Sequence, residues 1–288
     1  MAFTAFAEQK HREASSAEIG TLTTVFDHLE EPDTLAIGNA WTRSHYGGDF
    51  SLPVVPETRT AVSLTFVQSR DRNTGGADPS ALGGGDTDKH LLYEGLSRVA
   101  ADAVLVGAGT LHPMTFFSVW HPEVVALRQS LGFPRHPAQI VVSRHGQFDF
   151  TPLLFNVPDV PVFLICGEQC MDRHSTAIRE RPWVEPILFN ADRLTTAIDR
   201  LRLERGIHRI SAVGGRSTAT RLVDEGLAQD IYLTTGDREG GEAGTPWYVG
   251  SVPLALSTMT RKEWMDRQSR VVFEHILIRK ATVASALI

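Results

Sequence analysis

Ala101-Asp-Ala-Val-Leu-Val-Gly-Ala-Gly-Thr110 is the stretch that decides the fold. Its core, Ala103 to Val106, is a short apolar run without helical periodicity, which is typical of a strand buried on both faces of a parallel sheet. The run ends at Gly107 and Gly109, where the chain can turn sharply and a ligand can approach the backbone. Because ligands of open α/β sheets bind at the carboxyl ends of strands, we predict a nucleotide-binding turn here. A plain tight turn is the alternative, since the third glycine of the dinucleotide fingerprint is missing.

The composition of the 288 residues excludes several classes of protein. A formal net charge of −6 and the lack of basic clusters argue against nucleic-acid binding. No apolar run approaches the length of about 20 residues that a membrane helix needs, and the N-terminus lacks a signal-peptide pattern, so we expect a cytoplasmic protein without membrane partners. Cys166 and Cys170 form neither a disulfide framework nor a zinc motif, and the eleven histidines show no metal-ligand spacing, so no metal site is predicted.

Hydrophobic patterning predicts alternating strands and helices within one domain, residues 58–288. The predicted strands are 60–68, 103–106, 138–142, 160–166, 185–189, 209–213, 230–234 and 270–279, with helices at 88–100, 121–131, 171–181, 191–205 and 217–226. The final strand is expected to be antiparallel and at a sheet edge. Residues 1–57 are expected to form an N-terminal extension with a helix over 17–29. This extension either packs as an arm on the domain or on a second subunit, or forms a lid over a planar ligand.

Four strand ends carry glycine or polar turns that suit a phosphorylated ligand. They are Gly107-Ala-Gly109-Thr110, Ser143-Arg144, Gly167 and Gly214-Gly215-Arg216-Ser217-Thr218. The last precedes a predicted helix, so open backbone N–H groups, the helix dipole and an arginine together suit a pyrophosphate. Ser143 and Arg144 suit a second phosphate, such as the 2′-phosphate of NADPH. Ordinary capped turns are the alternative at each position, and the hypothesis depends on all four turns meeting at one sheet edge.

The order of these elements resembles the reductase domain of the bifunctional riboflavin-biosynthesis deaminase–reductases. Leu64 to Thr110, with its Ser69-x-Asp71 turn, is similar to one family signature, and Arg209 to Leu233, with its double glycine, to a second. The resemblance covers about residues 59 to 280. It implies a dihydrofolate-reductase-like α/β fold: a mostly parallel central sheet flanked by helices, with an antiparallel C-terminal strand. No deaminase half is present in the sequence.

The resemblance also implies a cofactor, a reaction and an assembly. The cofactor is NADPH, with its pyrophosphate at Gly214 and Gly215, its ribose or adenine near Gly107 to Thr110 and its 2′-phosphate near Ser143 and Arg144. The reaction reduces the ribose of a phosphoribosylamino-pyrimidine, and the assembly is a homodimer. Val67 and Ser69 are expected beside the nicotinamide.

Residues on the substrate side depart from the family pattern. Val213 stands where the family has a substrate-contacting Glu, and Gly83-Gly-Gly-Asp86 replaces a Ser/Trp/Thr segment. Asp71 is the candidate for orienting the substrate or, with a raised pKa, for donating the proton, unless it only closes a turn. Asp86 contacts substrate or caps a helix. Three aromatic residues are expected either to stack on a ring of the ligand or to form part of the core: Phe116, Phe117 and Trp120.

Three hypotheses follow. In the first, which we prefer, the protein is an NADPH-dependent reductase of a pyrimidine or pterin. In the second it is a nucleotide-binding sensor without turnover, and in the third an assembly protein whose fold no longer supports an enzymatic activity. Val213 and the mostly apolar segment 111–117 favour the second hypothesis.

Overall fold

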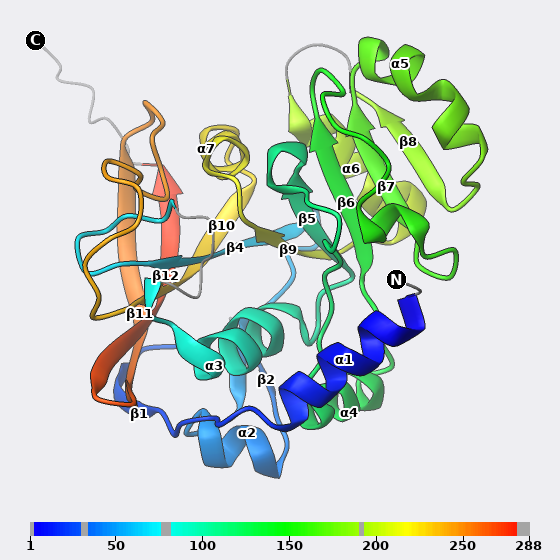
Figure 1. Ribbon diagram of the computed structural model, residues 1–288. Coiled ribbons are helices and arrows are strands. Elements are labelled where there is room, and N and C mark those ends of the chain that lie inside the picture. The colour runs from blue at the N-terminus through cyan, green and yellow to red at the C-terminus, as the bar shows by residue number, and fades with distance from the viewer. Residues whose placement is uncertain (1–2, 30–33, 76–81, 190–192, 281–288) are drawn as a thin grey trace, which may run out of the picture.

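A ten-stranded mixed sheet forms the centre of the molecule, which is represented here by a computed structural model (Figure 1). The structure describes residues 3–29, 34–75, 82–189 and 193–280. The strands of the sheet lie in the order β1-β11-β12-β10-β4-β9-β5-β6-β7-β8. Their bounds are β1 Thr23–Asp27, β4 Ala61–Gln68, β5 Ala103–Gly107, β6 Ala138–Ser143, β7 Val162–Cys166, β8 Val184–Leu188, β9 Arg209–Val213, β10 Ala228–Thr235, β11 Leu254–Asp266 and β12 Ser269–Lys280.

Seven adjacent strands, β10 through β8, are parallel, and β12, β11 and β1 extend one side of the sheet in antiparallel pairing. This arrangement confirms the predicted fold class. A separate hairpin-like pair is formed by β2 (Thr34–Ile37) and β3 (Phe50–Pro53). None of the helices among the described residues has the length and apolar character needed to cross a bilayer.

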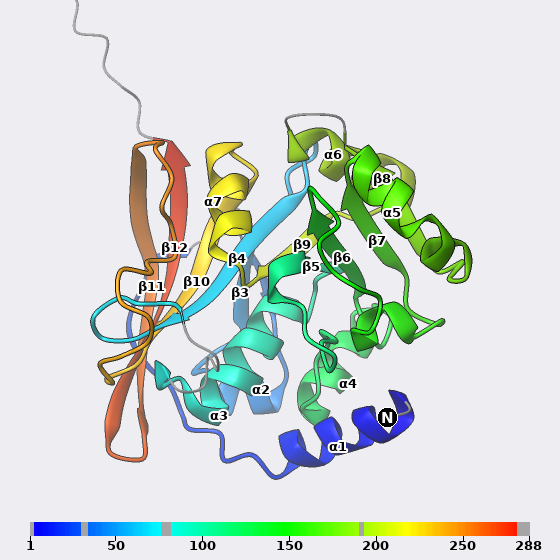
Figure 2. The same ribbon diagram turned by 45° about the horizontal axis from the view of Figure 1, so that its top comes forward.

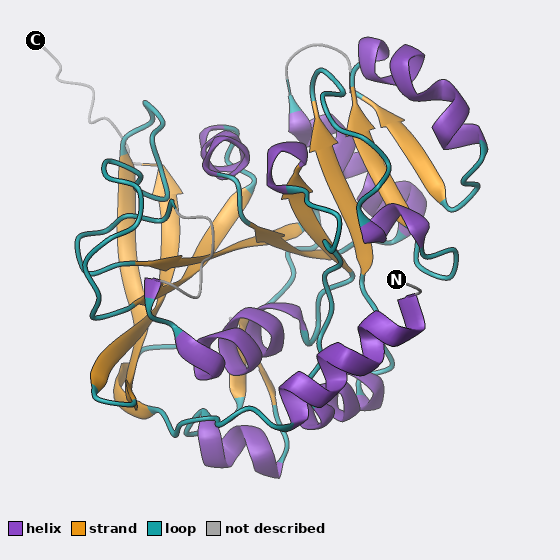
Figure 3. Ribbon diagram, viewed as in Figure 1, coloured by secondary structure: helices purple, strands orange, loops and turns teal. Residues whose placement is uncertain are grey.

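Helices cover both faces of the sheet, and Figures 1 and 2 show α7 and η2 on opposite sides of β4 and β9. The helical segments are α1 Phe3–Ser15, α2 Ala40–His45, α3 Gly85–Thr87, the π-helical η2 Asp88–Leu96, the 3₁₀ turns η3 Ala108–Thr110 and η4 Leu153–Asn156, α4 Pro122–Ser130, α5 Glu168–Arg179, α6 Leu194–Arg205 and α7 Arg216–Asp224. Figure 3 shows the helices distributed around the strands.

The opening stretch forms β5, whose five residues are all buried, as predicted for a central strand. Its side chains alternate between two cores. Ala103 and Leu105 belong to the core under α6 and α7, whereas Val104 and Val106 belong to the core that contains α5 residues. The strand is therefore fixed from both sides, and its carboxyl end at Gly107 is held in place.

The N-terminal segment differs from its prediction. The helix expected over 17–29 is wrong: this region contains β1, which pairs with β11, and the helix lies earlier at α1. Thr23-Thr-Val-Phe26 is rich in β-branched and aromatic residues, which favour a strand when a partner strand is available. In α1 the buried residues are Phe6 and Ala14.

The C-terminal strand prediction needs one correction. The strand 270–279 is present as β12 and is antiparallel, but it lies between β10 and β11 rather than at an edge. The covering strand β11 was not predicted, because its first half is largely exposed and lacks an apolar run.

Candidate functional site

A cavity of about 540 Å³ lies where the carboxyl ends of β5 and β6 meet the start of α7. Its walls include Gly107 to Thr110, Val142 to His145 and three residues after β9: Gly215, Ser217 and Thr218. Parallel pairing of β9, β5 and β6 brings these turns to one edge of the sheet, although more than a hundred residues separate the first from the last. The predicted meeting of the glycine turns is therefore present in the structure.

Glycines allow the turn after β5 and the turn after β9, which form the two main walls of this cavity, to pack closely against each other. A Cβ added at Gly107 would collide with the Thr218 hydroxyl. A Cβ at Gly214 or Gly215 would come within 3.1 Å of the Thr110 side chain. Gly214 and Gly215 also have φ of 64° and 75°, which L side chains rarely adopt. The turn after β9 thus needs glycine for its backbone conformation and for its contact with Thr110.

The start of α7 is suited to an anion. Gly215 is the N-cap, and the first N–H groups of a helix have no intrahelical acceptor, so the amides at the start of α7 and the helix dipole present partial positive charge. The side chains of Ser217 and Thr218 line the cavity beside them. Arg216 is half-buried and is not part of the cavity wall.

The turn after β6 supplies the second polar wall. The Gly146 amide donates to the Ser143 Oγ over 3.1 Å, which closes the turn and leaves Arg144 exposed at the cavity. Gly167 follows the neighbouring strand β7, and a Cβ added there would lie 3.1 Å from the Arg144 carbonyl oxygen. Gly167 therefore shapes the turn that presents Arg144 and does not itself line the cavity.

At the carboxyl edge of the sheet, β4 extends further than its neighbour β9. The pairing of β4 with β9 ends at Thr65 and Val213, whereas β4 continues to Gln68 in pairing with β10. Beyond Thr65 the β9 side of β4 is therefore free of strand pairing, and Val67 there is half-buried. This step in the edge lies between β4 and the turn after β9 that lines the cavity.

Comparison with known proteins identifies the family. Residues 64–273 match the model of the RibD C-terminal domain. The chain belongs to this family. A search by sequence among curated proteins finds no significant match.

Solved structures share the fold of this RibD C-terminal domain at low sequence identity. A pyrimidine reductase-like protein of Corynebacterium diphtheriae superposes with a TM-score of 0.62 at 21% identity, covering 80% of this chain and 96% of the other. The riboflavin biosynthesis reductase Rib7 of Saccharomyces cerevisiae gives 0.53 at 17%, covering 77% and 92%. Acinetobacter baumannii RibD gives 0.56 at 14%, and this chain covers 59% of its length from 77% of its own.

Ser69 and Asp71 lie in a closed turn of the RibD C-terminal domain. The fully buried Ser69 hydroxyl donates to the Gly240 carbonyl over 2.9 Å, and Asp71 accepts from the Asn73 side chain over 2.7 Å and from the Gly240 amide over 3.2 Å. Hydrogen bonds from Ser69, Gly240 and Asn73 lower the pKa of Asp71 below its ordinary value. The expected raised pKa is wrong, because Asp71 is exposed and surrounded by donors.

The two predicted substrate residues, Val213 and Asp86, lie in different surroundings. Val213 is 1% exposed and lies in the core with Val104 and Val106. Asp86 is exposed in the short helix α3, whose N-cap is Gly84, so Asp86 does not cap it.

The aromatic residues of the segment after η3 are core residues, as one of the two interpretations held. Phe116 and Trp120 are buried, with ring centroids 6.2 Å apart, and Phe6 of α1 packs on both. Phe117 is half-buried under the Arg98 guanidinium.

Sequence reasoning missed several residues of the cavity wall. They are Ala108, Val142, His145, Gln147, Leu194 and Arg221. His145 and Val142 flank the predicted Ser143-Arg144 turn and could have been predicted by extending that turn by one residue on each side. Leu194 and Arg221 come from α6 and the second turn of α7, and only the tertiary structure brings them to this edge. Arg221 donates to Glu225 over 2.8 Å and lies over the Phe189 ring.

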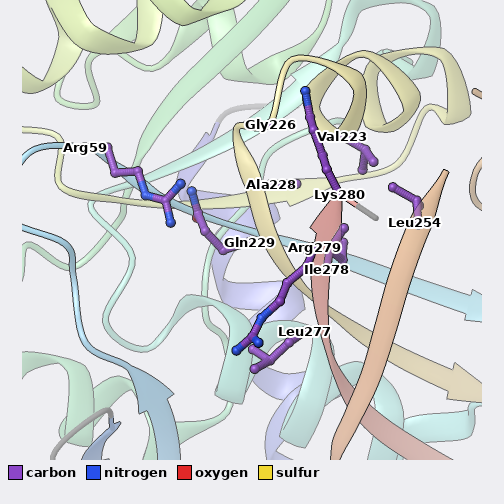
Figure 4. A pocket seen from close by; sticks show the side chains of 10 residues that line it. All are labelled: Arg59, Val223, Gly226, Ala228, Gln229, Leu254, Leu277, Ile278, Arg279 and Lys280. Carbon is purple, nitrogen blue, oxygen red and sulfur yellow. The ribbon is translucent and has the colours of Figure 1, made fainter. Parts of the chain in front are cut away.

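A second cavity of about 450 Å³ lies at the opposite end of the sheet, among the start of β10, Arg59 ahead of β4 and the end of β12 (Figure 4). Its basic side chains diverge. Arg59 lies beside Gln229, whereas Arg279 and Lys280 point in opposite directions. Lys280 donates to the Asp224 carbonyl at the end of α7 over 2.8 Å. Because its basic side chains point in different directions, this cavity does not suit a single bound anion.

Proposed function

We propose that the protein is an NADPH-dependent oxidoreductase that reduces a pyrimidine- or pterin-type substrate, in the manner of 5-amino-6-(5-phosphoribosylamino)uracil reductase. The observation that carries the proposal is the cavity at the carboxyl edge of the sheet, where two glycine turns, a helix start and Arg144 meet. Membership of the RibD C-terminal domain family supports the reaction class. We further propose a homodimer in the cytoplasm.

The residues present fit the cofactor. Gly109 of the cavity wall borders open space, since a Cβ added there would meet nothing within 4 Å, and the start of α7 suits the pyrophosphate. Arg144 is placed to pair with the 2′-phosphate, since a guanidinium binds phosphate in a bidentate manner. When bound, NADPH supplies the hydride, and the protein orients its nicotinamide and excludes water. Val67, at the step in the sheet edge, is the side chain we expect to flank the nicotinamide. Asp71 is ionised at neutral pH, so its proposed role is to orient substrate rather than to donate a proton.

The test is a binding titration of NADPH and NADH with the intact chain, followed by nicotinamide fluorescence. We expect NADPH to bind more tightly, and Arg144→Gln to weaken NADPH at least about tenfold while NADH changes little, because one charge-assisted contact is lost. Arg179→Gln, an exposed arginine near the end of α5, is the matched control and should behave as wild type. Failure of the wild type to bind either dinucleotide would reject the proposal.

A second candidate is an NADPH-binding sensor without turnover. Val213, buried where the family has an acidic substrate contact, favours it. Tight NADPH binding with no loss of nicotinamide absorbance on addition of a diaminopyrimidine ribotide or dihydrofolate would select the sensor over the reductase.

A further inference from the structure

The two cysteines of the chain lie next to each other in the core, where β7 leads into α5. Cys166 is the last residue of β7 and Cys170 lies in the first turn of α5. Both side chains are 0% exposed, and both are free thiols. The Cys166 thiol donates a hydrogen bond to the Cys170 sulfur, so the two sulfur atoms are in contact. The function proposed above uses neither of them.

Cys170 is the more reactive of the two thiols. The hydrogen bond from Cys166 lowers the pKa of Cys170 against the opposing effect of burial, and the Arg173 guanidinium lowers it further. Donating the same bond raises the pKa of Cys166. The start of α5 adds the partial positive charge of a helix N-terminus. Oxidants attack the thiolate form, so Cys170 is the nucleophile, and Cys166 is placed to react with the oxidised Cys170.

Both cysteines also contact the turn after β6 that presents Arg144. Cys166 is the register partner of Ser143, whose hydroxyl closes this turn by accepting from the Gly146 amide. A Cβ added at Gly146 would lie only 2.9 Å from the Cys170 Cα and 3.0 Å from its sulfur. The turn therefore packs directly on the cysteine pair.

Hydrogen bonds from the next turn of α5 hold the same segment. The Gly146 carbonyl accepts from the Arg173 guanidinium over 3.2 Å and lies 2.8 Å from the His174 Nε2. Arg173 and His174 follow Cys170 by three and four residues, so all three lie on one face of the helix. A displacement of Cys170 therefore reaches Gly146 both directly and through these two side chains.

We propose that Cys166 and Cys170 form a reversible disulfide on exposure to hydroperoxides, and that this disulfide displaces the turn carrying Arg144 and so weakens dinucleotide binding. Bridging the sulfur atoms brings them to about 2.05 Å, which moves Cys170 toward β7 and alters its contact with Gly146. The statement about the dinucleotide rests on the proposed function. By thermodynamic linkage, a dinucleotide bound at this turn disfavours the disulfide.

The oxidation consumes one peroxide. The Cys170 thiolate attacks one oxygen of hydrogen peroxide, the O–O bond breaks, and the departing hydroxide takes up the proton that Cys170 released, forming water. The Cys166 sulfur then attacks the sulfur of the Cys170 sulfenic acid, the S–O bond breaks, and the departing hydroxide takes the Cys166 proton to form a second water. The two thiols lose two electrons and the peroxide gains them.

The first experiment counts thiols. Because the chain has only two cysteines, the intact mass and the number of thiols alkylated by iodoacetamide in denaturant report on this pair alone. We expect two alkylated thiols in the reduced protein. Hydrogen peroxide should give none, with a mass lower by two hydrogens, and dithiothreitol should restore both. Cys166→Ala should stop at the sulfenic acid, which dimedone traps on Cys170.

The second experiment follows the turn and the dinucleotide site. We expect the disulfide form to bind NADPH at least about tenfold more weakly, as for Arg144→Gln, because the same charge-assisted contact is lost. Trypsin should cleave after Arg144 several-fold faster in the disulfide form, a readout that needs no cofactor. The double variant Cys166→Ala/Cys170→Ala, treated with peroxide, should keep its NADPH affinity and its cleavage rate. If it does not fold, recovery of the wild type in dithiothreitol replaces it, since methionine sulfoxide survives that reagent.

Several outcomes would overturn the inference. Thiols that stay free, or masses that rise by whole oxygen atoms without a disulfide, would reject the bridge. A disulfide form that binds NADPH and is cleaved by trypsin like the reduced form would reject its coupling to the turn, as would an equal loss of affinity in the double variant. If the reduced protein binds no dinucleotide, the proposed function fails, while the thiol count and the cleavage after Arg144 still decide between the bridge, its coupling to the turn and neither.

Discussion

Asp88 shows at the scale of one residue how a buried carboxylate can oppose stability. It is the first residue of η2 and accepts a hydrogen bond from the Thr234 hydroxyl of β10 over 2.5 Å. The raised pKa of its carboxyl means that the folded protein holds a proton between pH 3.8 and about 6 that the unfolded chain releases. The cost of the buried charge is therefore absent near pH 4 and complete above pH 6.

We predict that Asp88→Asn stabilises the protein at pH 8 and not at pH 4. The gain in the free energy of unfolding should be about 1 to 2 kcal/mol, since one pKa unit corresponds to about 1.4 kcal/mol and the residue is only half-buried. Urea denaturation of both proteins at the two pH values measures it. A variant that is less stable than wild type at pH 8 would contradict the assignment of a buried, unpaired charge.

Gly107 carries a second prediction at the residue scale. Gly107→Ala should lower the free energy of unfolding by about 1 to 3 kcal/mol, because its Cβ collides with the Thr218 hydroxyl. Thr218→Ala removes that hydroxyl, so the double variant Gly107→Ala/Thr218→Ala should recover most of the loss. Denaturant midpoints of the four proteins give the coupling energy, and additive effects would contradict the proposed contact.

At the scale of elements, the sequence predicts the strands that are buried on both faces and misses the strands that are largely exposed. The strands β5, β7 and β9 are fully buried runs and were predicted to within two residues at each end. The strand β1 was misassigned as a helix and β11 was missed, because both expose much of their length and are stabilised by each other's hydrogen bonds. The pair Asp88–Thr234 was equally hidden, since 146 residues separate its members.

Two aromatic side chains of helix α1, Phe3 and Phe6, pack against the domain, and Phe6 is the more deeply buried. Phe6 is buried and packs edge-on to Trp120 at 5.7 Å between ring centroids. We expect Phe6→Ala to cost about 3 to 4 kcal/mol of stability, as for other buried phenylalanines, with NADPH affinity unchanged because Phe6 does not line the cavity. Thermal melts with and without NADPH test both parts, and the exposed Gln9→Ala serves as control. A loss of NADPH affinity in Phe6→Ala would indicate that α1 helps to form the site.

At the scale of the whole molecule, the proposed homodimer is open to direct measurement. Light scattering of the purified protein should give twice the chain mass of 31.7 kDa at micromolar concentration. A mass of one chain over the same range would reject the dimer.

The contact between the turn after β5 and the start of α7 also determines when binding can begin in the cell. Thr110 emerges from the ribosome long before Gly214, Gly215 and Thr218, which complete its wall. A nascent chain halted before residue 209 lacks β9, α7 and with them one side of the cavity. The cavity is thus completed late in biosynthesis, and under the proposed function a ribosome-bound chain becomes able to retain a dinucleotide only after α7, which ends at Asp224, has been translated.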